Sequence, residues 1–348
     1  MKKILWVFMV ALMSIALIAC SSNSASNEGS SGSSSGSGSE GSSSSSGSDS
    51  GKPETYNLMF ATGTTTGTYY PLGAIFSDFW NKKLDFVKAS SQATNGSVQN
   101  LVFIKNGEAQ VALVPTGTLW EAYNGEASFK DNKVENVRIL AGLYPNVNHF
   151  VVRKGSGIET IADTAGKKVV PGATGSATEI EAQHAFEVYG VDYEKLSKDF
   201  VGFTEATDLM RNKQTDAAMI MAGVPTSAVT EMLSTADGQL LSYSSEAIDK
   251  LKEKYPWTME YTIKANTYEN QPEDVLTVAQ NNFMIASTDM PDEVAYELVK
   301  SFWEGLEDMK GSHAVVDQFS IEKAIEGTSD VPLHPGAEKY YKEVGVLK

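Results

Sequence analysis

The sequence predicts an α/β protein whose chain forms two similar lobes around a cleft, each lobe a mixed sheet flanked by helices. Segments of strand character alternate with segments of helical period, which is typical of α/β layering. The same order of strand, glycine-rich turn and helix also occurs twice, which indicates a duplication. The matching positions are Gly63 with Gly172, Asn106 with Asn212, and Pro115 with Pro225, and they are 109, 106 and 110 residues apart.

In the first copy, residues 56–61 have the pattern of a strand and lead into a turn at 63–68. Apolar side chains at 72, 75, 76 and 79 follow at helical spacing, so a helix with one buried face is expected there. A second helix opens at Asn95-Gly96-Ser97, with Val98, Leu101 and Val102 directed inward, and ends at Asn106-Gly107, where glycine supplies a left-handed cap. Residues 109–114 then form a buried strand that ends at Pro115.

The second copy repeats these elements with different side chains. A strand at 169–170 leads into the turn at 171–179, and a helix with an apolar face at 182–189 follows. Another helix ends at 209–212, and a buried strand at 217–221 stops before Gly223-Val224-Pro225. Two copies of this unit predict paired lobes rather than one nucleotide-binding fold.

The connections between the lobes set the expected domain boundaries. Residues 147–153 and 282–287 have strand character and are expected to cross between the lobes, and everything after about 284 is expected to be helical. We therefore expect residues 54–148 plus 284–348 to form lobe 1 and residues 149–283 to form lobe 2.

The N-terminus predicts export and a lipid anchor. Lys2 and Lys3 precede the apolar run Ile4 to Ala19, and Cys20 follows small residues, as in a lipoprotein signal peptide over residues 1–19. The run is shorter than the roughly 20 residues of a spanning helix. The alternative is a buried helix that ends in a core cysteine. Residues 20–53, the lipidated Cys20 followed by a Ser/Gly tract, are expected to tether the body with a reach of roughly 30 Å from the cell membrane, outside the cytoplasm.

Charge and cysteine content narrow the range of partners. Loss of Lys2 and Lys3 with the signal leaves 26 basic and 44 acidic side chains. Such a surface disfavours nucleic acid and anionic lipid as partners, although a buried anionic ligand stays possible because distant charges are screened. Cys20 is the single cysteine, so no disulfide can form within one chain. A monomer is expected.

Ligand binding is expected where strands end and helices begin. Parallel sheets bind ligands at the carboxyl ends of their strands, and the free N–H groups of helix starts hold carboxylates or phosphates there without cationic side chains. Four such junctions, two in each lobe, are expected to converge on a small anionic or zwitterionic ligand. The candidate residues are Gly63, Thr64, Thr65, Thr66, Tyr69, Tyr70, Asn95, Gly96, Ser97, Pro115, Thr116, Gly172, Thr174, Gly175, Ser176, Thr178 and Gly223.

Each of these loops also has a purely structural explanation. Gly, Thr and Ser are the residues that any strand-to-helix turn favours. Tyr69 and Tyr70 either line the ligand pocket or are half-buried side chains with a packing role alone. His149, beside the crossing strand, is a weaker candidate because a lone histidine is more often structural.

The sequence lacks the usual catalytic and cofactor motifs. The glycine spacing at 36–41 matches a dinucleotide-binding pattern, but no strand precedes it. The four histidines share no metal-ligand spacing, so neither a metal nor a cofactor is expected. Ser176 and His184 form the nearest nucleophile and base pair, yet eight residues of helix separate them by about 12 Å. We therefore expect no enzyme.

Four motifs resemble a known family. The segments 60–71, 95–101, 142–153 and 332–341 are similar, in order, to motifs of the TAXI family, the extracytoplasmic solute receptors of tripartite ATP-independent periplasmic (TRAP) transporters. The resemblance covers about residues 55–348. Two positions depart from the family pattern: Gln99 stands where glutamate is usual, and Pro115-Thr116-Gly117 replaces a Gln-Ser-Asp-like stretch.

The resemblance implies a fold and a function. The fold is the type II periplasmic-binding-protein fold, with the ligand in the cleft between the lobes. Such a receptor closes on a small organic acid or amino acid, often glutamate or a relative, and delivers it to sodium-driven TRAP permease subunits in the membrane. Two alternatives remain open: a ligand-sensing lipoprotein that serves another transporter or a signalling system, and an enzyme on the same fold.

Overall fold

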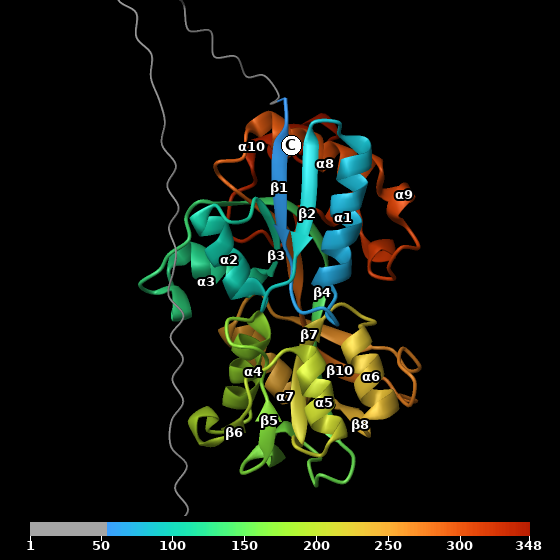
Figure 1. Ribbon diagram of the computed structural model, residues 1–348. Coiled ribbons are helices and arrows are strands. Elements are labelled where there is room, and N and C mark those ends of the chain that lie inside the picture. The colour runs from blue at the N-terminus through green and yellow to red at the C-terminus, as the bar shows by residue number, and fades with distance from the viewer. Residues whose placement is uncertain (1–53) are drawn as a thin grey trace, which may run out of the picture. The chain divides into compact units, whose positions relative to one another are not determined.

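A mixed ten-stranded sheet forms the frame of the described part of the chain, residues 54–348 of the computed structural model (Figure 1). The expected signal peptide, the lipidation of Cys20 and the tether lie outside the described residues. The strand order is β2-β1-β3-β10-β4-β7-β5-β6, with β8 beside β4 and β9 beside β10. The strands are β1 (Tyr56–Ala61), β2 (Val87–Gln92), β3 (Val111–Pro115), β4 (Val137–Arg153), β5 (Lys168–Val170), β6 (Ser197–Lys198), β7 (Ala217–Ala222), β8 (Gly238–Leu241), β9 (Met259–Ile263) and β10 (Val275–Ser287).

The internal duplication is visible in the strand pairing. Strand β1 lies between β2 and β3, and both pairs are parallel. Strand β5 lies in the same way between β6 and β7, again with parallel pairs. The two copies therefore share one strand order, which confirms the repeat predicted from the offsets and the α/β, two-lobed class.

Helices flank both halves of the sheet and return the chain between parallel strands. In α1 the buried side chains Leu72, Phe76, Phe79 and Trp80 recur at helical spacing, and Lys82 and Lys83 lie at its negative C-terminal end. The helices are α1 (Tyr69–Lys83), α2 (Ser97–Asn106), α3 (Thr116–Asn124), α4 (Ala177–Val188), α5 (Phe203–Arg211), α6 (Ser227–Thr235), α7 (Ser245–Lys254), α8 (Asp292–Glu304), α9 (Leu306–Met309) and α10 (Pro335–Glu343).

One detail of α2 differs from the sequence prediction. The apolar spacing predicts that Val98 and Val102 point inward, but both are only partly buried. The buried face is instead made by Asn100, Leu101 and Ile104. The helix is rotated because Asn100 bonds the ends of two strands: its Nδ2 donates to the carbonyls of Thr62 and Leu113.

Strands β4 and β10 connect the two halves of the sheet (Figure 1). The first part of β4 pairs antiparallel with β10, and its later part pairs with β7 and β8. Strand β10 pairs with β9 near its start and with β3 near its end. The chain thus passes from one half to the other along β4 and returns along the adjacent β10.

Apolar side chains form separate clusters in the two halves. Two clusters draw on residues up to 144 and from 283 onward, and the other two draw on residues 147–279. The division into residues 54–148 plus 284–348 and residues 149–283 stays a prediction, and lobe 1 and lobe 2 denote these two sets below. Within residues 54–348, no helix combines the length and the hydropathy that a bilayer span requires.

The core of lobe 1 provides a stability prediction. Phe76 is fully buried, and its ring lies 5.1 Å from that of Phe302 and 6.0 Å from those of Phe60 and Phe319. Because truncation leaves a cavity, Phe76→Ala is expected to lower the free energy of unfolding by about 3–5 kcal/mol. Phe200→Ala, at a position 43% exposed, is expected to change it by less than about 0.5 kcal/mol. Urea titrations of both variants check this, and equal losses contradict it.

Candidate ligand-binding site

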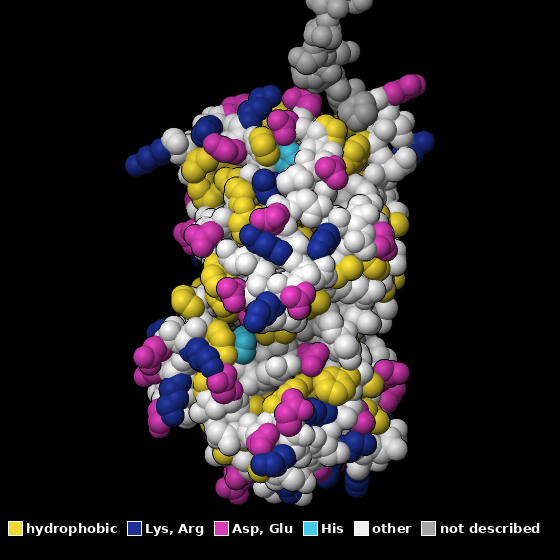
Figure 2. All heavy atoms as spheres, turned by 90° about the vertical axis from the view of Figure 1, so that its left-hand side faces the viewer, with side chains coloured by type: hydrophobic (Ala, Val, Ile, Leu, Met, Phe, Trp, Pro, Cys, Tyr) yellow, Lys and Arg dark blue, Asp and Glu magenta, His cyan; other side chains and the backbone are white. Residues whose placement is uncertain are grey.

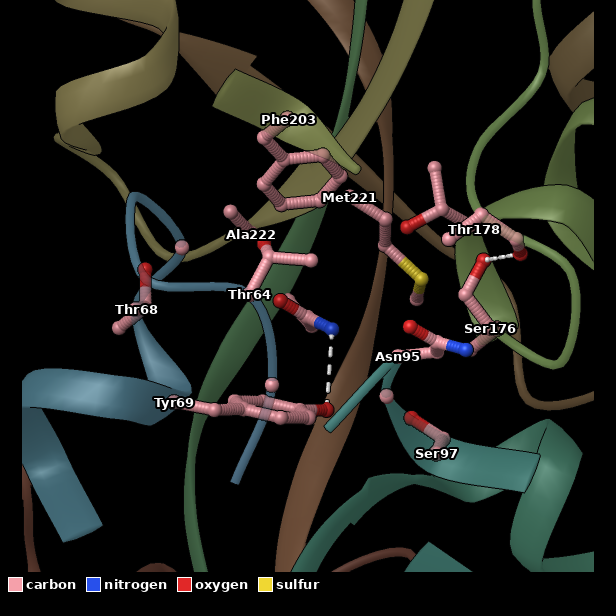
Figure 3. A pocket seen from close by; sticks show the side chains of 16 residues that line it. Thr64, Thr68, Tyr69, Asn95, Ser97, Ser176, Thr178, Phe203, Met221 and Ala222 are labelled. Carbon is pink, nitrogen blue, oxygen red and sulfur yellow. Dashed lines mark hydrogen bonds between the residues drawn. The ribbon is translucent and has the colours of Figure 1, made fainter. Parts of the chain in front are cut away.

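Four helices begin at one cavity between the lobes. The first residues of α1 and α2 reach it from lobe 1, and those of α4 and α5 reach it from lobe 2 (Figure 3). The cavity contains about 450 Å³ of free space, counting the solvent at its mouth. It is lined by Gly63, Thr64, Gly67, Thr68, Tyr69, Asn95, Gly96, Ser97, Asn146, Ala173, Ser176, Ala177, Thr178, Phe203, Met221 and Ala222.

Local sequence explains why the helix starts face the cavity. Gly96 adopts φ +115°, a value that side chains disfavour, and α2 begins directly after it. Ser176 caps α4, because its Oγ accepts from the N–H of Glu179. The same Oγ donates to the carbonyl of Ala173, the bond dashed at Ser176 in Figure 3. The Glu179 side chain does not bond back to the cap, and its Oε1 accepts from Gln183 and Tyr193.

The cavity carries no side-chain charge. None of its sixteen lining residues, all within the described part of the chain, is Asp, Glu, Lys, Arg or His. The first N–H groups of a helix have no acceptor within the helix, and the helix dipole adds partial positive charge there. Four such ends around one space favour an anion, which backbone amides can hold without a cation.

A buried hydrogen-bond chain forms the floor of the cavity. The hydroxyl of Tyr69 donates to Asn282 Oδ1 at 2.5 Å and accepts from Asn146 Nδ2 at 3.3 Å. Burial raises the pKa of Tyr69 well above the usual tyrosine value, so the hydroxyl keeps its proton. Asn146 is 2% exposed, and its Oδ1 has no hydrogen-bond partner in the structure.

The wall on the lobe 2 side is partly apolar. Phe203, Met221 and Ala222 lie together opposite the hydroxyls of Ser97 and Ser176 (Figure 3). The cavity therefore has a polar side, made by helix starts and hydroxyls, and an apolar side. A ligand that is anionic at one end and apolar at the other matches this division.

The lobes touch each other around the cavity. Thr68 Oγ1 accepts from the N–H of Gly223 at 3.0 Å, and the carbonyl of Thr66 accepts from the N–H of Ala228 at 3.3 Å. On the other side, the N–H of Gln99 donates to the carbonyl of Gly175 at 3.3 Å. These bonds join residues of lobe 1 to residues of lobe 2, so the structure has the lobes closed on one another.

Eight of the residues proposed from sequence line the cavity. They are Gly63, Thr64, Tyr69, Asn95, Gly96, Ser97, Ser176 and Thr178. Thr66 and Gly223 lie at its rim, in the contacts between the lobes. Gly172, Thr174 and Gly175 belong to the turn before α4.

The remaining proposed residues point elsewhere. Tyr70 is 38% exposed and does not line the cavity, whereas its neighbour Tyr69 is 9% exposed and does. Thr65 is exposed. Pro115 ends β3, and Thr116 Oγ1 donates to the carbonyl of Asn281 beside a separate groove.

Sequence reasoning missed Phe203, Asn146 and Met221 as lining residues. Phe203 starts α5 and lies 106 residues after Ser97, which starts α2, so the repeat offset itself contained the signal. Asn146 lies on β4 and is brought to the cavity by the pairing of β4 with β10. No short-range pattern marks such a position.

The histidines are structural in this part of the chain. His149 Nδ1 pairs with the carbonyl of Ile220, and Nε2 pairs with the Tyr268 hydroxyl at 2.9 Å. Burial lowers the pKa of His149 to about 4, so the ring is neutral at physiological pH. Among residues 54–348, no three acidic or histidine side chains are grouped as a metal site would require.

A second buried polar cluster lies where α3 meets lobe 2. Glu181 on α4 accepts from Gln280, Asn148 and His184. Glu121 on α3 is 4% exposed, and its Oε2 has no partner. Burial, together with the nearby Glu181 carboxylate, raises the pKa of Glu121 to about 7.

Glu121 therefore predicts a pH dependence of stability. The pKa of Glu121 in the folded protein lies above its value in the unfolded chain, so the folded state binds more protons between about pH 4.5 and 7. The free energy of unfolding is therefore highest below this window and falls as pH rises through it. In wild type this lowers the free energy of unfolding by up to about 3 kcal/mol between low pH and pH 8, and Glu121→Gln, which cannot ionise, is expected not to show this decrease. The exposed Glu269→Gln is the control. Denaturant midpoints from pH 5 to 8 measure it, and parallel curves for wild type and Glu121→Gln contradict it.

The turn before α4 predicts a contrast between two glycines. At Gly172, with φ +125°, an added Cβ meets the N–H of Glu179 at 2.9 Å and Ser176 Oγ at 3.0 Å. At Gly175, with φ +78°, an added Cβ meets nothing within 4 Å. Gly172→Ala is therefore expected to displace the start of α4 and cost about 2 kcal/mol or more, and Gly175→Ala about 1 kcal/mol. Thermal unfolding of both variants measures these costs. A larger loss of stability for Gly175→Ala than for Gly172→Ala contradicts the prediction.

Comparison with known proteins agrees with this architecture. The model of the NMT1-like family matches residues 60–345. Among solved structures, a protein titled as a periplasmic transporter has a TM-score of 0.53 at 10% identity, over 83% of this chain and 92% of its own. MatC from Rhodopseudomonas palustris has a TM-score of 0.52 at 13% identity, over 83% and 94%. PhnD1 from Prochlorococcus marinus has a TM-score of 0.50 at 11% identity, over 84% and 99%. These likenesses show the fold of two-lobed binding proteins.

Proposed function

This chain belongs to the NMT1-like family, and we propose that it is an extracytoplasmic solute receptor that captures a small organic acid or amino acid by closing two lobes on it. The receptor is held at the cell membrane by lipid on Cys20 and passes its ligand to the permease subunits of a TRAP-type transporter. The permease assignment and a glutamate-like ligand rest on the resemblance of the sequence motifs to the TAXI family.

One observation carries the proposal: the starts of α1, α2, α4 and α5 converge on one uncharged cavity between the lobes. Equivalent helices of the two copies supply these ends, so both lobes contribute to one anion site. Two of the solved structures with this fold were obtained with malate and with methylphosphonate, both small anions. This supports a small anionic ligand here.

Closure follows from the connection between the lobes. Strands β4 and β10 pass side by side from lobe to lobe and serve as the hinge. A ligand that touches both lobes adds contacts which an open form lacks, so binding favours the closed form. We assign as ligand contacts the residues whose polar groups or backbone line the cavity, namely Gly63, Thr64, Thr68, Tyr69, Asn95, Gly96, Ser97, Asn146, Ser176 and Thr178.

The overall surface charge is compatible with this role. The chain has a formal net charge of −16, yet acidic and basic side chains are interspersed over the face shown in Figure 2. Exposed charges farther from the cavity than about 8–10 Å are largely screened at physiological salt. Local helix dipoles therefore dominate at the cavity.

Two other functions share the same fold and differ in the step after ligand binding. A ligand-sensing lipoprotein would bind the same solute and signal, or it would serve another transporter. An enzyme on this fold would turn the ligand over. Uptake of labelled solute into proteoliposomes that contain the proposed TRAP-type permease, measured with and without the receptor, decides for or against transport. Product analysis after prolonged incubation with candidate acids decides for or against catalysis.

The adjacent tyrosines provide a matched test of the cavity. Tyr69→Phe removes the hydroxyl that joins Asn282 and Asn146 at the cavity floor, so affinity for the solute is expected to fall about tenfold or more. Tyr70→Phe, outside the cavity, is expected to leave affinity unchanged. A thermal-shift panel of amino acids and carboxylates identifies a bound solute, and calorimetry with that solute compares the variants. Equal affinities for the two variants place the site elsewhere.

Thr68 provides a test of closure. Thr68→Val leaves the N–H of Gly223 without its partner in the closed form, so the closed form is expected to lose stability relative to the open form. Small-angle X-ray scattering without ligand is expected to show a larger radius of gyration for Thr68→Val than for wild type. The exposed Thr65→Val is the control. Unchanged scattering for Thr68→Val argues against the closure contacts described above.

A further inference from the structure

We propose that the ligand is a small 2-hydroxy monocarboxylate, and thus neither an amino acid nor a dicarboxylate. The inference rests on the proposed receptor function, narrows its ligand class to organic acids and replaces the glutamate-like ligand that the motif resemblance implies. Three features of the cavity carry it: its charge, its apolar wall and the unpaired oxygen of Asn146.

The charge of the cavity disfavours an ammonium group. An α-ammonium enclosed here would face four positive helix ends, with no carboxylate among the sixteen lining residues. Burying an ionised ammonium without a paired charge costs several kcal/mol. The two acids nearest the start of α4 do not line the cavity. Glu179 accepts from Gln183 and Tyr193. Glu181 is bonded to Gln280, Asn148 and His184. The site therefore holds an anionic group and rejects a cationic one.

The apolar wall disfavours a second carboxylate. One carboxylate is accommodated by the starts of α2 and α4, which present N–H groups from opposite lobes, with the Ser97 hydroxyl beside them. The space beyond is bounded by Phe203, Met221 and Ala222 (Figure 3). The side chains of this wall offer no hydrogen-bond donor to a second carboxylate. A ligand with a short apolar body fits this side.

The unpaired oxygen of Asn146 favours a ligand that carries a hydrogen-bond donor. Asn146 Nδ2 donates to the Tyr69 hydroxyl, and that hydroxyl donates onward to Asn282 Oδ1, which orients the amide. Asn146 is one of the lining residues, and its Oδ1 is left as a buried acceptor without a partner. A buried acceptor that stays unpaired is costly, so a ligand that donates to it gains affinity over one that cannot. With an ammonium disfavoured, a hydroxyl next to the carboxylate is the remaining donor of suitable size.

Matched ligands separate the three features by calorimetry on the full soluble receptor. Lactate is the reference. Propionate lacks the hydroxyl, pyruvate replaces it with an acceptor, alanine replaces it with an ammonium, and malate adds a second carboxylate. Lactate or 2-hydroxybutyrate is expected to bind at least about tenfold more tightly than each of these four and than glutamate.

The outcomes distinguish this inference from the proposed function. If glutamate, alanine or malate binds as tightly as lactate, the ligand class is wrong and the receptor function stands. If propionate or pyruvate equals lactate, the role of Asn146 Oδ1 is overturned. If none of these acids and no other solute in a thermal-shift panel binds, the receptor function itself fails.

Variants at Asn146 provide a readout that loss of folding cannot mimic. Asn146→Asp places a carboxylate in the cavity and is expected to reverse the preference, with alanine then binding more tightly than lactate. Asn146→Leu is expected to abolish the difference between lactate and propionate. Asn132→Asp, at an exposed position in lobe 1, controls for added charge and is expected to keep the wild-type order. An unchanged order of lactate and alanine in Asn146→Asp overturns the proposal, provided that thermal unfolding shows a folded protein.

Discussion

The structure depends on one constraint, the alignment of helix starts that parallel strand pairing imposes. In each half, a central strand lies between two parallel neighbours, so the helices that follow start at the same edge of the sheet. Because β4 and β10 join the two halves through an antiparallel pair, these two edges face each other. The positive ends of four helices are thereby directed at one small space without any cationic side chain.

A second constraint is that the buried polar side chains on the crossing strands β4 and β10 need hydrogen-bond partners. Strands β4 and β10, which join the two halves of the sheet, are largely buried, yet they carry Asn146, Asn148, Gln280 and Asn282 in their central parts. Each of the four takes part in a side-chain hydrogen bond, with Tyr69, Glu181 or the N–H of Gly117. Such buried networks restrict packing to one arrangement when their partners are in place. The hinge is therefore both apolar enough to be buried and specific in its register.

Much of this architecture is encoded in local patterns. The helix at 69–83 follows from apolar spacing, the turn at Gly96 from a residue tolerant of positive φ, and the duplication from three agreeing offsets. Positions set by distant pairing were not accessible in this way. Asn146 reaches the cavity only because β4 pairs with β10, and Tyr69 rather than Tyr70 faces it because of the phase of α1 against lobe 1. A sequence pattern gives the period of a helix but fixes its rotation to within a residue only when the packing partner is known.

The route of the chain through the hinge has a consequence for how such receptors diversify. Val147, just before the chain leaves lobe 1, is paired with Ala279, just before the chain comes back. The intervening segment thus begins and ends at neighbouring points, like an insertion into a host domain. A segment of this kind can be exchanged between related proteins without rerouting the rest of the polypeptide. Recombination could therefore replace half of the recognition surface while the other half is inherited unchanged.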